Sequence, residues 1–275
     1  MNITSKYKKT THTTSLQSRT ENECKPFFVS IPDLPKVHQN DLVRLSLIDP
    51  DTFNVLLLRE KHREFLRRPL FQKDEKLLPE SYMGLDASKP WIIYWTLHAL
   101  DLLDSIPSEE TLKGIVHTLD ACWSNTDQTG GGFGGGIGQM PHCATSYAAV
   151  MALCIIVGLD ESLYSEAKKL ALDLLQQKRQ EMLKWFLTLR YETIDEVSGK
   201  LLCGYRMHHD GEVDVRATYC VCAVASLLDI LTDELTNGMS NHVASCQTHE
   251  GGFGGEPGLE AHGGNFVTMV NVHCI

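Results

Sequence analysis

The chain has 275 residues, 43% of them hydrophobic, which is enough for one large core or two ordinary ones. Its formal net charge of −10 argues against a nucleic-acid surface as a main function. No stretch holds about 18 consecutive apolar residues, so we expect no membrane span.

Residues 1–40 are expected to form a disordered or extended tail. The first twenty residues carry four basic side chains, no acidic one and no apolar run, which argues against a signal peptide or an anchor. The residues that follow contain Pro26, Pro32 and Pro35, which predict an extended lead-in.

The nine cysteines are scattered without the spacing of a disulfide framework. Several, such as Cys154 and Cys220, lie inside apolar helical runs. This pattern predicts buried thiols in a reducing, cytoplasmic compartment.

A first core-packing helix is expected from about Asp49 to Pro69, because the apolar residues between Val55 and Leu66 recur at helical spacing. Its other faces carry a basic cluster of Arg59, Lys61, Arg63, Arg67 and Arg68. The ordinary interpretation of this cluster is a solvated face, and a surface for an acidic partner is the sharper alternative.

Residues 72–86 are expected to be a loop, and the next helix begins at Asp86-Ala87-Ser88-Lys89-Pro90, with the proline in its first turn. Trp91, Trp95, His98 and Leu102 then share one helical face. On general grounds this face is an aromatic core stripe rather than the wall of a ligand site. A further helix is expected from Ser108 to Cys122.

Two glycine-rich loops match each other in register. Residues 131–142 and residues 251–262 correspond from the first glycine to the final histidine, at an offset of 120 residues. A helix that ends in a cysteine precedes each loop, at Cys122 and at Cys246. A unit of helix, glycine-rich loop, histidine and helix that occurs twice indicates a repeat architecture.

The two loops hold residues with different expected roles. Glycine lets a backbone lie close against a neighbour, and Phe133 and Phe253 can anchor the loops between helices, so these residues are interpreted as tight connectors. His142 and His262 are interpreted as functional candidates, because a polar ring at a loop-to-helix junction faces a cavity or solvent more often than a core.

The chain between the loops is expected to be helical over 144–157, 163–180, 213–231 and 233–246. The pattern falters over Met182–Tyr205, which predicts a surface excursion outside the core. His208-His209-Asp210 predicts a polar turn. Because no long strand alternation occurs, the chain is predicted to be all-α.

Four sequence blocks in a fixed order, 87–95, 131–150, 211–220 and 260–264, together form a specific motif pattern. With them the chain resembles the β subunits of protein farnesyltransferases, of plant type, over roughly residues 50–180 and 206–264. The resemblance implies an α/α toroid, a ring of helix pairs around an apolar funnel. It also implies an α subunit as partner, a zinc ion, and transfer of farnesyl from farnesyl diphosphate to the Cys of a C-terminal Cys-a-a-X tail.

The resemblance also implies site residues. Trp91, Trp95 and Tyr219 would wall the isoprenoid channel, and the bulk of Trp91 would limit it to farnesyl length. Arg216 could hold a carboxylate or diphosphate through its fork, with a salt bridge to Asp214 or Glu212 as the ordinary alternative. The implied farnesyl diphosphate group is His262, Gly263, Gly264, Asn265, Arg216, Tyr219 and Trp91, and the implied peptide-facing group is Trp91, Trp95, His142, Ala144 and Arg216.

Three departures from the family pattern shape the expected architecture. The family's zinc ligands, an Asp-x-Cys pair and a later His, fall beyond Gly264 and are not present here. Asn265 stands where the family has an aromatic residue, and Met182–Tyr205 replaces a short turn. We therefore expect an unclosed, partial toroid over 41–264, an atypical insert at 182–205 and a non-family tail at 265–275.

These departures leave alternatives open. The chain is expected to be inactive without zinc, and any substitute ligands would be sought among His142, Cys143, His208, His209 and Cys220. One alternative function is a non-catalytic partial toroid that binds an isoprenoid or the α subunit. Another is a geranylgeranyltransferase type I β subunit, against which Trp91 argues.

Overall fold

The computed structural model describes residues 12–24, 34–44, 57–70, 80–126 and 128–265. The chain divides into two units, residues 1–62 and residues 63–275. Each unit is considered by itself.

The described part of the first unit is helical rather than extended. Helix α1 (His12–Cys24) and helix α2 (Lys36–Arg44) occupy much of the expected tail, and helix α3 (Arg59–Arg67) begins at the end of this unit. An ion pair between Arg19 and Glu23, one helical turn apart, supports α1. The expected start of the first helix, at Asp49, lies outside the described residues.

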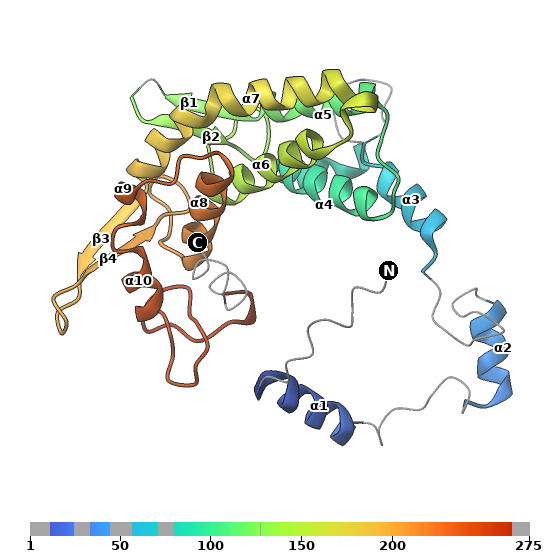
Figure 1. Cartoon of the computed structure of the whole chain (residues 1–275), viewed down its shortest axis with the longest axis horizontal. Coiled ribbons are helices and arrows are strands. Elements are labelled where there is room, and N and C mark those ends of the chain that lie inside the picture. The colour runs from blue at the N-terminus through green and yellow to red at the C-terminus, as the bar shows by residue number, and fades with distance from the viewer. Residues whose placement is uncertain (1–11, 25–33, 45–56, 71–79, 127, 266–275) are drawn as a thin grey trace. The chain divides into compact units, whose positions relative to one another are not determined.

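The second unit is built mainly from helices in two layers (Figure 1). Helices α4, α6 and α8 contact one another in sequence, and α5 and α7 pack together beside them. The helices are η4 (Glu80–Ser88), α4 (Lys89–Leu102), α5 (Glu109–Ala121), α6 (Cys143–Gly158), α7 (Glu161–Thr188), α8 (Val215–Leu227), α9 (Asp233–Thr236) and α10 (Met239–Ser245).

The helix ends follow from local chemistry. Ser108 caps α5 by accepting from the Thr111 N–H, and Asp160 caps α7 by accepting from the Ser162 N–H. Pro90 sits in the first turn of α4, as expected. The single helix expected over 233–246 is instead two, α9 and α10, because Gly238 between them takes a φ of 83°.

The expected mostly helical class is confirmed, with two small antiparallel hairpins added. Strand β1 (Trp123–Thr126) pairs with β2 (Gly130–Phe133), and β3 (Arg190–Ile194) pairs with β4 (Leu201–Tyr205). Sequence alternation could not reveal β2, whose residues are Gly-Gly-Gly-Phe. Its glycines are needed for space, since a Cβ on Gly132 would lie 2.5 Å from the Trp185 ring.

The same connection between helices occurs three times in the described part of this unit. In each copy, the residue that follows the helix before the loop (α5, α7 or α10) accepts a hydrogen bond through its carbonyl. The donor is the backbone N–H of the residue after an aromatic residue of the loop, which is Phe133, Tyr205 or Phe253. These bonds are Gly134 N to Cys122 O at 2.8 Å, Arg206 N to Leu189 O at 2.9 Å and Gly254 N to Cys246 O at 2.9 Å. Two copies coincide with the sequence repeat, and the third, between them, was not visible as a repeat.

Each connection then folds back over the start of an earlier helix, which is α4 for the loop after α5, α6 for the loop after α7 and α8 for the loop after α10. We call α4, α6 and α8 the inner helices. One loop carbonyl accepts from the first backbone N–H of that helix. The bonds are Lys89 N to Gly135 O at 2.9 Å, Cys143 N to Met207 O at 2.8 Å and Val215 N to Gly255 O at 2.9 Å. These N–H groups have no partner inside their own helices, so the loop satisfies them.

The expectation that Met182–Tyr205 lies outside the core was wrong. Met182, Trp185 and Phe186 are fully buried, because α7 continues to Thr188 and packs against β2. The Tyr205 hydroxyl donates to the Leu235 carbonyl at 2.6 Å. This stretch is the middle copy of the connection, and only the far end of its β3–β4 hairpin projects from the helices (Figure 1).

Replacing Gly135 by Ala should destabilise the second unit. A Cβ at this position would collide with the Ala87 carbonyl oxygen, so the bond between Gly135 and Lys89 could not keep its geometry. We expect a loss of about 1–3 kcal/mol in the free energy of unfolding, measured by urea titration with circular dichroism.

Gly114→Ala is the matched control for Gly135→Ala. A Cβ at Gly114, inside α5, meets no atom within 4 Å, and Ala favours a helix by up to about 1 kcal/mol. The control should therefore be neutral or stabilising. Equal stabilities for the two variants would contradict the role given to Gly135.

Limited proteolysis should separate the hairpin tip from the rest of Met182–Tyr205. Thermolysin is expected to cut first near Ile194 and Val197, whose side chains are 60% and 98% exposed. Early cleavage between Met182 and Phe186 would show that this part of α7 does not belong to the folded core.

Replacing Trp185 by Ala should lower the free energy of unfolding by about 3–5 kcal/mol, because the side chain is fully buried.

Candidate functional site

Aromatic side chains from the three inner helices form a continuous row. Helix α4 supplies Trp91, Tyr94 and Trp95, helix α6 supplies Tyr147, and helix α8 supplies Tyr219. Trp91 lies 5.1 Å from Trp95 and 6.0 Å from Tyr147, and Tyr147 lies 5.5 Å from Tyr219, between ring centroids. These are the separations of interacting rings, so the five side chains form one surface, which we call the aromatic row.

The aromatic row is not part of the hydrophobic core. The core face of α4 carries Ile92, Ile93 and Leu97, whereas Trp95 is 60% exposed. The interpretation of Trp91 and Trp95 as a core stripe was therefore wrong. A large exposed aromatic surface on helices whose opposite face is buried is available to an apolar ligand.

One hydrogen bond ties the row together across two helices. The hydroxyls of Tyr147 and Tyr219 lie 3.3 Å apart. Burial, followed by this hydrogen bond, raises the pKa of Tyr147. Tyr147 thus remains a neutral hydroxyl at physiological pH and adds no charge to an apolar surface.

His142 caps the start of α6 beside the row. Its Nδ1 accepts from the Ala144 N–H at 3.1 Å, so the proton of the neutral ring is on Nε2. Its ring lies 5.4 Å from that of His208. Burial first, and then the neighbouring His208, lower the pKa of His142. His142 is therefore neutral and presents an N–H donor, in agreement with its half-buried position.

Arg216 and Asp214 form a bidentate ion pair at the start of α8. Arg216 Nε donates to Asp214 Oδ1 at 2.9 Å, and a terminal nitrogen of Arg216 donates to Oδ2 at 2.8 Å. The salt bridge considered as the ordinary alternative is therefore present. It leaves the arginine side chain 53% exposed, with further N–H groups for a second anion. Hydrogen bonding to Asp214 raises the pKa of Arg216, so the charge is permanent.

His262 repeats the capping geometry of His142. Its Nδ1 accepts from the Gly264 N–H at 3.1 Å, and its backbone N–H donates to the Phe253 carbonyl at 3.0 Å. His262, Gly263 and Gly264 are exposed. The similarity of the two histidines in sequence thus has a structural counterpart, since each ring accepts from the backbone N–H two residues further on.

Asn265 is buried near Gly255, unlike the exposed residues before it. The Oδ2 of Asp214 and the Nδ2 of Asn265 lie 3.2 Å and 3.9 Å from the position that a Cβ on Gly255 would take. Asn265 is buried. Asp214, the partner of Arg216, and Asn265 therefore both lie near Gly255.

The implied site residues form two neighbouring groups. Trp91, Trp95 and Tyr219 lie in the aromatic row, and Arg216 lies one helical turn before Tyr219 on α8. His142 and Ala144 start the adjacent helix, close enough for the charge of Arg216 to affect the pKa of His142. His262 contacts the backbone of its own turn.

Sequence reasoning assigned no role to two neighbours of these residues, Tyr94 and Tyr147, and it considered His208 only as a substitute metal ligand and Glu212 only as a salt-bridge partner. One signal for Tyr147 was available. It lies five residues after the capping His142, as Tyr219 lies five residues after the capping Asp214. Aligning helix starts rather than glycines would have placed the two tyrosines together.

The described residues do not provide a zinc site. Nowhere in the described ranges do three His, Cys, Asp or Glu side chains gather around one point. Burial raises the pKa of Cys143, and that of Cys220 to about 12. The Nδ1 atoms of His142 and His208 are already hydrogen-bonded. The substitute ligands considered from the sequence thus do not converge on one point in the described part of the chain.

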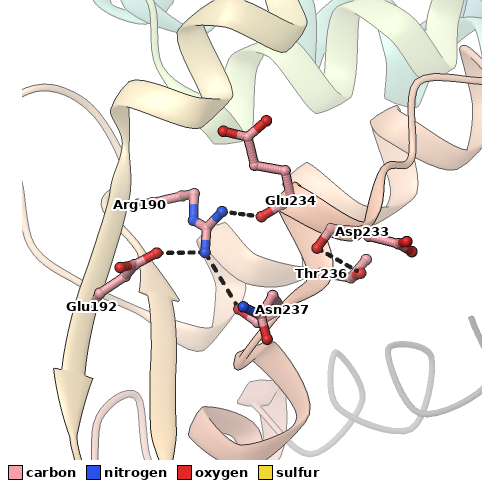
Figure 2. A pocket seen from close by; sticks show the side chains of 6 residues that line it. All are labelled: Arg190, Glu192, Asp233, Glu234, Thr236 and Asn237. Carbon is pink, nitrogen blue, oxygen red and sulfur yellow. Dashed lines mark hydrogen bonds and ion pairs between the residues drawn. The ribbon is translucent and has the colours of Figure 1, made fainter.

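A separate polar cavity of about 600 Å³ lies beside the base of the β3–β4 hairpin (Figure 2). Arg190 lies in its wall, with Glu192 at 2.5 Å and the Glu234 carbonyl as partners. The Asn237 carbonyl lies at 3.4 Å. These bonds fasten the hairpin to α9, so we assign this cavity a structural role.

Within the described part of the chain, no helix is both long and apolar enough to cross a membrane.

Comparison with known proteins defines the family context of these residues. A family model described as the prenyltransferase alpha-alpha toroid domain matches residues 57–275. The protein farnesyltransferase subunit beta of Arabidopsis thaliana is 41% identical over 219 residues, covering 80% of this chain and 39% of that protein. The corresponding protein of Pisum sativum is 39% identical, covering 64% of this chain and 36% of that protein. The chain thus spans less than half the length of these relatives.

A solved structure shares the fold. It is that of Candida albicans protein geranylgeranyltransferase-I complexed with GGPP, which aligns with a TM-score of 0.50 at 17% identity. The alignment covers 78% of this chain and 58% of the solved chain. At this identity the likeness supports the toroid architecture alone.

Acidification should destabilise the chain through His142. Burial lowers its pKa below the ordinary value of 6.5 in the folded state, so the unfolded chain takes up the proton first. The free energy of unfolding therefore falls as the pH drops through about 6.5 and levels off below the folded pKa. Urea titrations from about pH 8 to about pH 5 measure this slope.

His142→Asn tests the assignment, because Asn retains a capping oxygen without a titrating ring. The slope should become shallower. A residual slope of the same sign is expected from His242, whose pKa burial also lowers. An unchanged slope in His142→Asn would contradict the role of His142.

Proposed function

This chain belongs to the prenyltransferase α-α toroid family, and we propose that it acts as a β-type subunit of a protein farnesyltransferase. In this role it would bind farnesyl diphosphate and the C-terminal Cys-a-a-X tail of a protein substrate. The observation that carries the proposal is the aromatic row, which ends one helical turn from the exposed arginine of the Arg216–Asp214 pair.

The aromatic row suits the apolar part of the substrate. An isoprenoid chain has no hydrogen-bonding groups, so its binding depends on apolar area removed from water. Trp91, Tyr94 and Tyr147 are half-buried and in mutual contact, with centroid separations of 6.2, 6.0 and 6.1 Å. We propose that the bulk of Trp91 favours farnesyl over a longer chain.

The arginine pair suits the diphosphate. During transfer the bond between farnesyl C1 and the diphosphate oxygen breaks, and a bond forms between C1 and the cysteine sulfur, which gives up its proton. The departing diphosphate gains negative charge, and a fixed guanidinium stabilises that charge. Asp214 holds Arg216 in place while leaving part of its fork exposed.

His142 suits the peptide. Its neutral ring carries the proton on Nε2, because Nδ1 accepts from the Ala144 N–H. An N–H donor at a helix start can bond a peptide carbonyl or terminal carboxylate. Ala144 next to it is half-buried, and its small side chain leaves space for the substrate.

The proposal includes an α subunit as partner and the cytoplasm as location, where unpaired thiols stay reduced. A zinc ion would activate the substrate thiol in an enzyme of this kind, but the described residues do not form its site. Hence we assign substrate binding to the described residues and no catalytic step to the metal. Turnover by these residues alone is not expected.

Calorimetric titration with farnesyl diphosphate tests the binding role of Arg216. Loss of one charged hydrogen-bond donor to a diphosphate should weaken binding in Arg216→Gln by about tenfold or more. Lys184→Gln removes an equal charge from an exposed position on α7 and should leave affinity unchanged. The same titration with inorganic diphosphate separates the anion contact from the apolar one.

Two results would count against the proposal. Wild-type protein that shows no preference for farnesyl diphosphate over inorganic diphosphate would exclude the aromatic row as an isoprenoid surface. Equal weakening by Arg216→Gln and Lys184→Gln would reduce the arginine effect to general electrostatics.

A further inference from the structure

A cavity that shares no residue with the aromatic row lies between the end of α3 and the connection from α4 to α5. It is a cavity of about 480 Å³ lined by Glu64, Arg67, Arg68, Ile106, Pro107 and Ser108. We call it the arginine cavity. All of its lining belongs to the second unit.

The arginine cavity is held by hydrogen bonds from α3 to the connection. Arg63 donates through Nε to the Leu103 carbonyl at 3.2 Å, and Arg67 donates to the Ser105 hydroxyl at 2.7 Å. Leu103 ends α4, where a cation is favoured by the exposed carbonyls. Two arginines of the basic cluster, Arg63 and Arg67, therefore attach α3 to the connection between α4 and α5.

Arg67 and Arg68 remain without a carboxylate partner among the described residues. Arg67 bonds only the neutral Ser105 hydroxyl, and Arg68 lies 5.9 Å from the Phe65 ring. Glu64 lines the same cavity but lies beyond ion-pair distance of both. In a chain of net charge −10, two exposed arginines facing one cavity without a carboxylate partner suit an external anion.

The acids nearest to Ser108 are committed elsewhere. The Glu109 carboxylate accepts from the Glu166 N–H at 2.8 Å, on α7. The Glu110 carboxylate pairs with Lys113 at 2.8 Å. Neither is therefore directed at the arginines.

The cavity also has apolar surface. Pro107 is buried and Ile106 half-buried in its wall, and the adjacent Phe65 ring is 59% exposed. A ligand that places a carboxylate on the arginines and an apolar side chain on this wall would complement both features. A membrane surface would offer only head-group charge to the arginines and would leave the apolar wall uncovered.

We propose that the arginine cavity is a docking site for an acidic segment of a protein partner, one that carries carboxylate and large apolar side chains. Arg68 supplies the main contact to the carboxylate. Arg67, already fixed by Ser105, supports it. This docking is independent of the farnesyl diphosphate site.

The test is fluorescence anisotropy of the full chain with a labelled peptide of alternating Glu and Leu. Arg68→Gln should weaken binding by about fivefold, the upper range for an exposed ion pair. Lys61→Gln removes the same charge from α3 outside the cavity lining and should change binding by less than about twofold. Binding should also weaken as salt is raised.

Further arms make the result decisive. A peptide with Gln in place of Glu should bind more weakly than the acidic peptide, and phosphatidylserine vesicles should not bind at all. The proposal is overturned if the acidic peptide does not bind, if Arg68→Gln and Lys61→Gln weaken it equally, or if the Gln peptide binds as well. Preferential binding to the vesicles would assign the cavity to a membrane surface and would also overturn it.

Discussion

The backbone hydrogen bond from the start of each inner helix to the carbonyl of its own closing loop organises the second unit. It occurs at Lys89, Cys143 and Val215, with distances between 2.8 and 2.9 Å. Each bond fixes where an inner helix begins relative to the loop that leads to the next inner helix. Side chains a few residues further along therefore lie at one level, and this is why Tyr147 and Tyr219 meet although 72 residues of chain separate them. The aromatic row follows from a repeated main-chain contact.

The repeated contact also explains how far the sequence could predict the fold. Ser108 and Asp160 mark the starts of α5 and α7, and Pro90 marks the start of α4. The two glycine loops match in sequence because both bring a backbone close to a helix start. At Gly135 a Cβ would collide with the Ala87 carbonyl. The middle copy performs the same contact with Met207, whose buried side chain has room. A main-chain carbonyl needs no particular side chain, so this copy left no trace in the sequence pattern.

The sequence could predict which residues form the candidate site, but not which side chains are exposed or how they are hydrogen-bonded. The resemblance placed Trp91, Trp95, Tyr219 and Arg216 together, and general burial statistics misassigned the tryptophans, because the apolar content of α4 is high on both faces. Which face is buried depends on α6, which packs on the side of Ile93 and Leu97. The tautomer of His142 likewise follows from one backbone N–H and could not be inferred from spacing.

Asp214 connects the fold to the proposed chemistry. Its carboxylate accepts from the Arg216 backbone N–H at 2.7 Å, which caps α8, and from the Arg216 side chain, which orients the guanidinium. It is buried and lies close to Gly255. The cap requires an accepting oxygen, and the bidentate contact with the guanidinium holds the carboxylate in place for it. A change at Asp214 would thus alter helix stability and anion binding together, whereas a change at Arg216 leaves the capping oxygen in place. The two residues form one unit in structure, yet only the arginine can be varied to measure its contribution to binding.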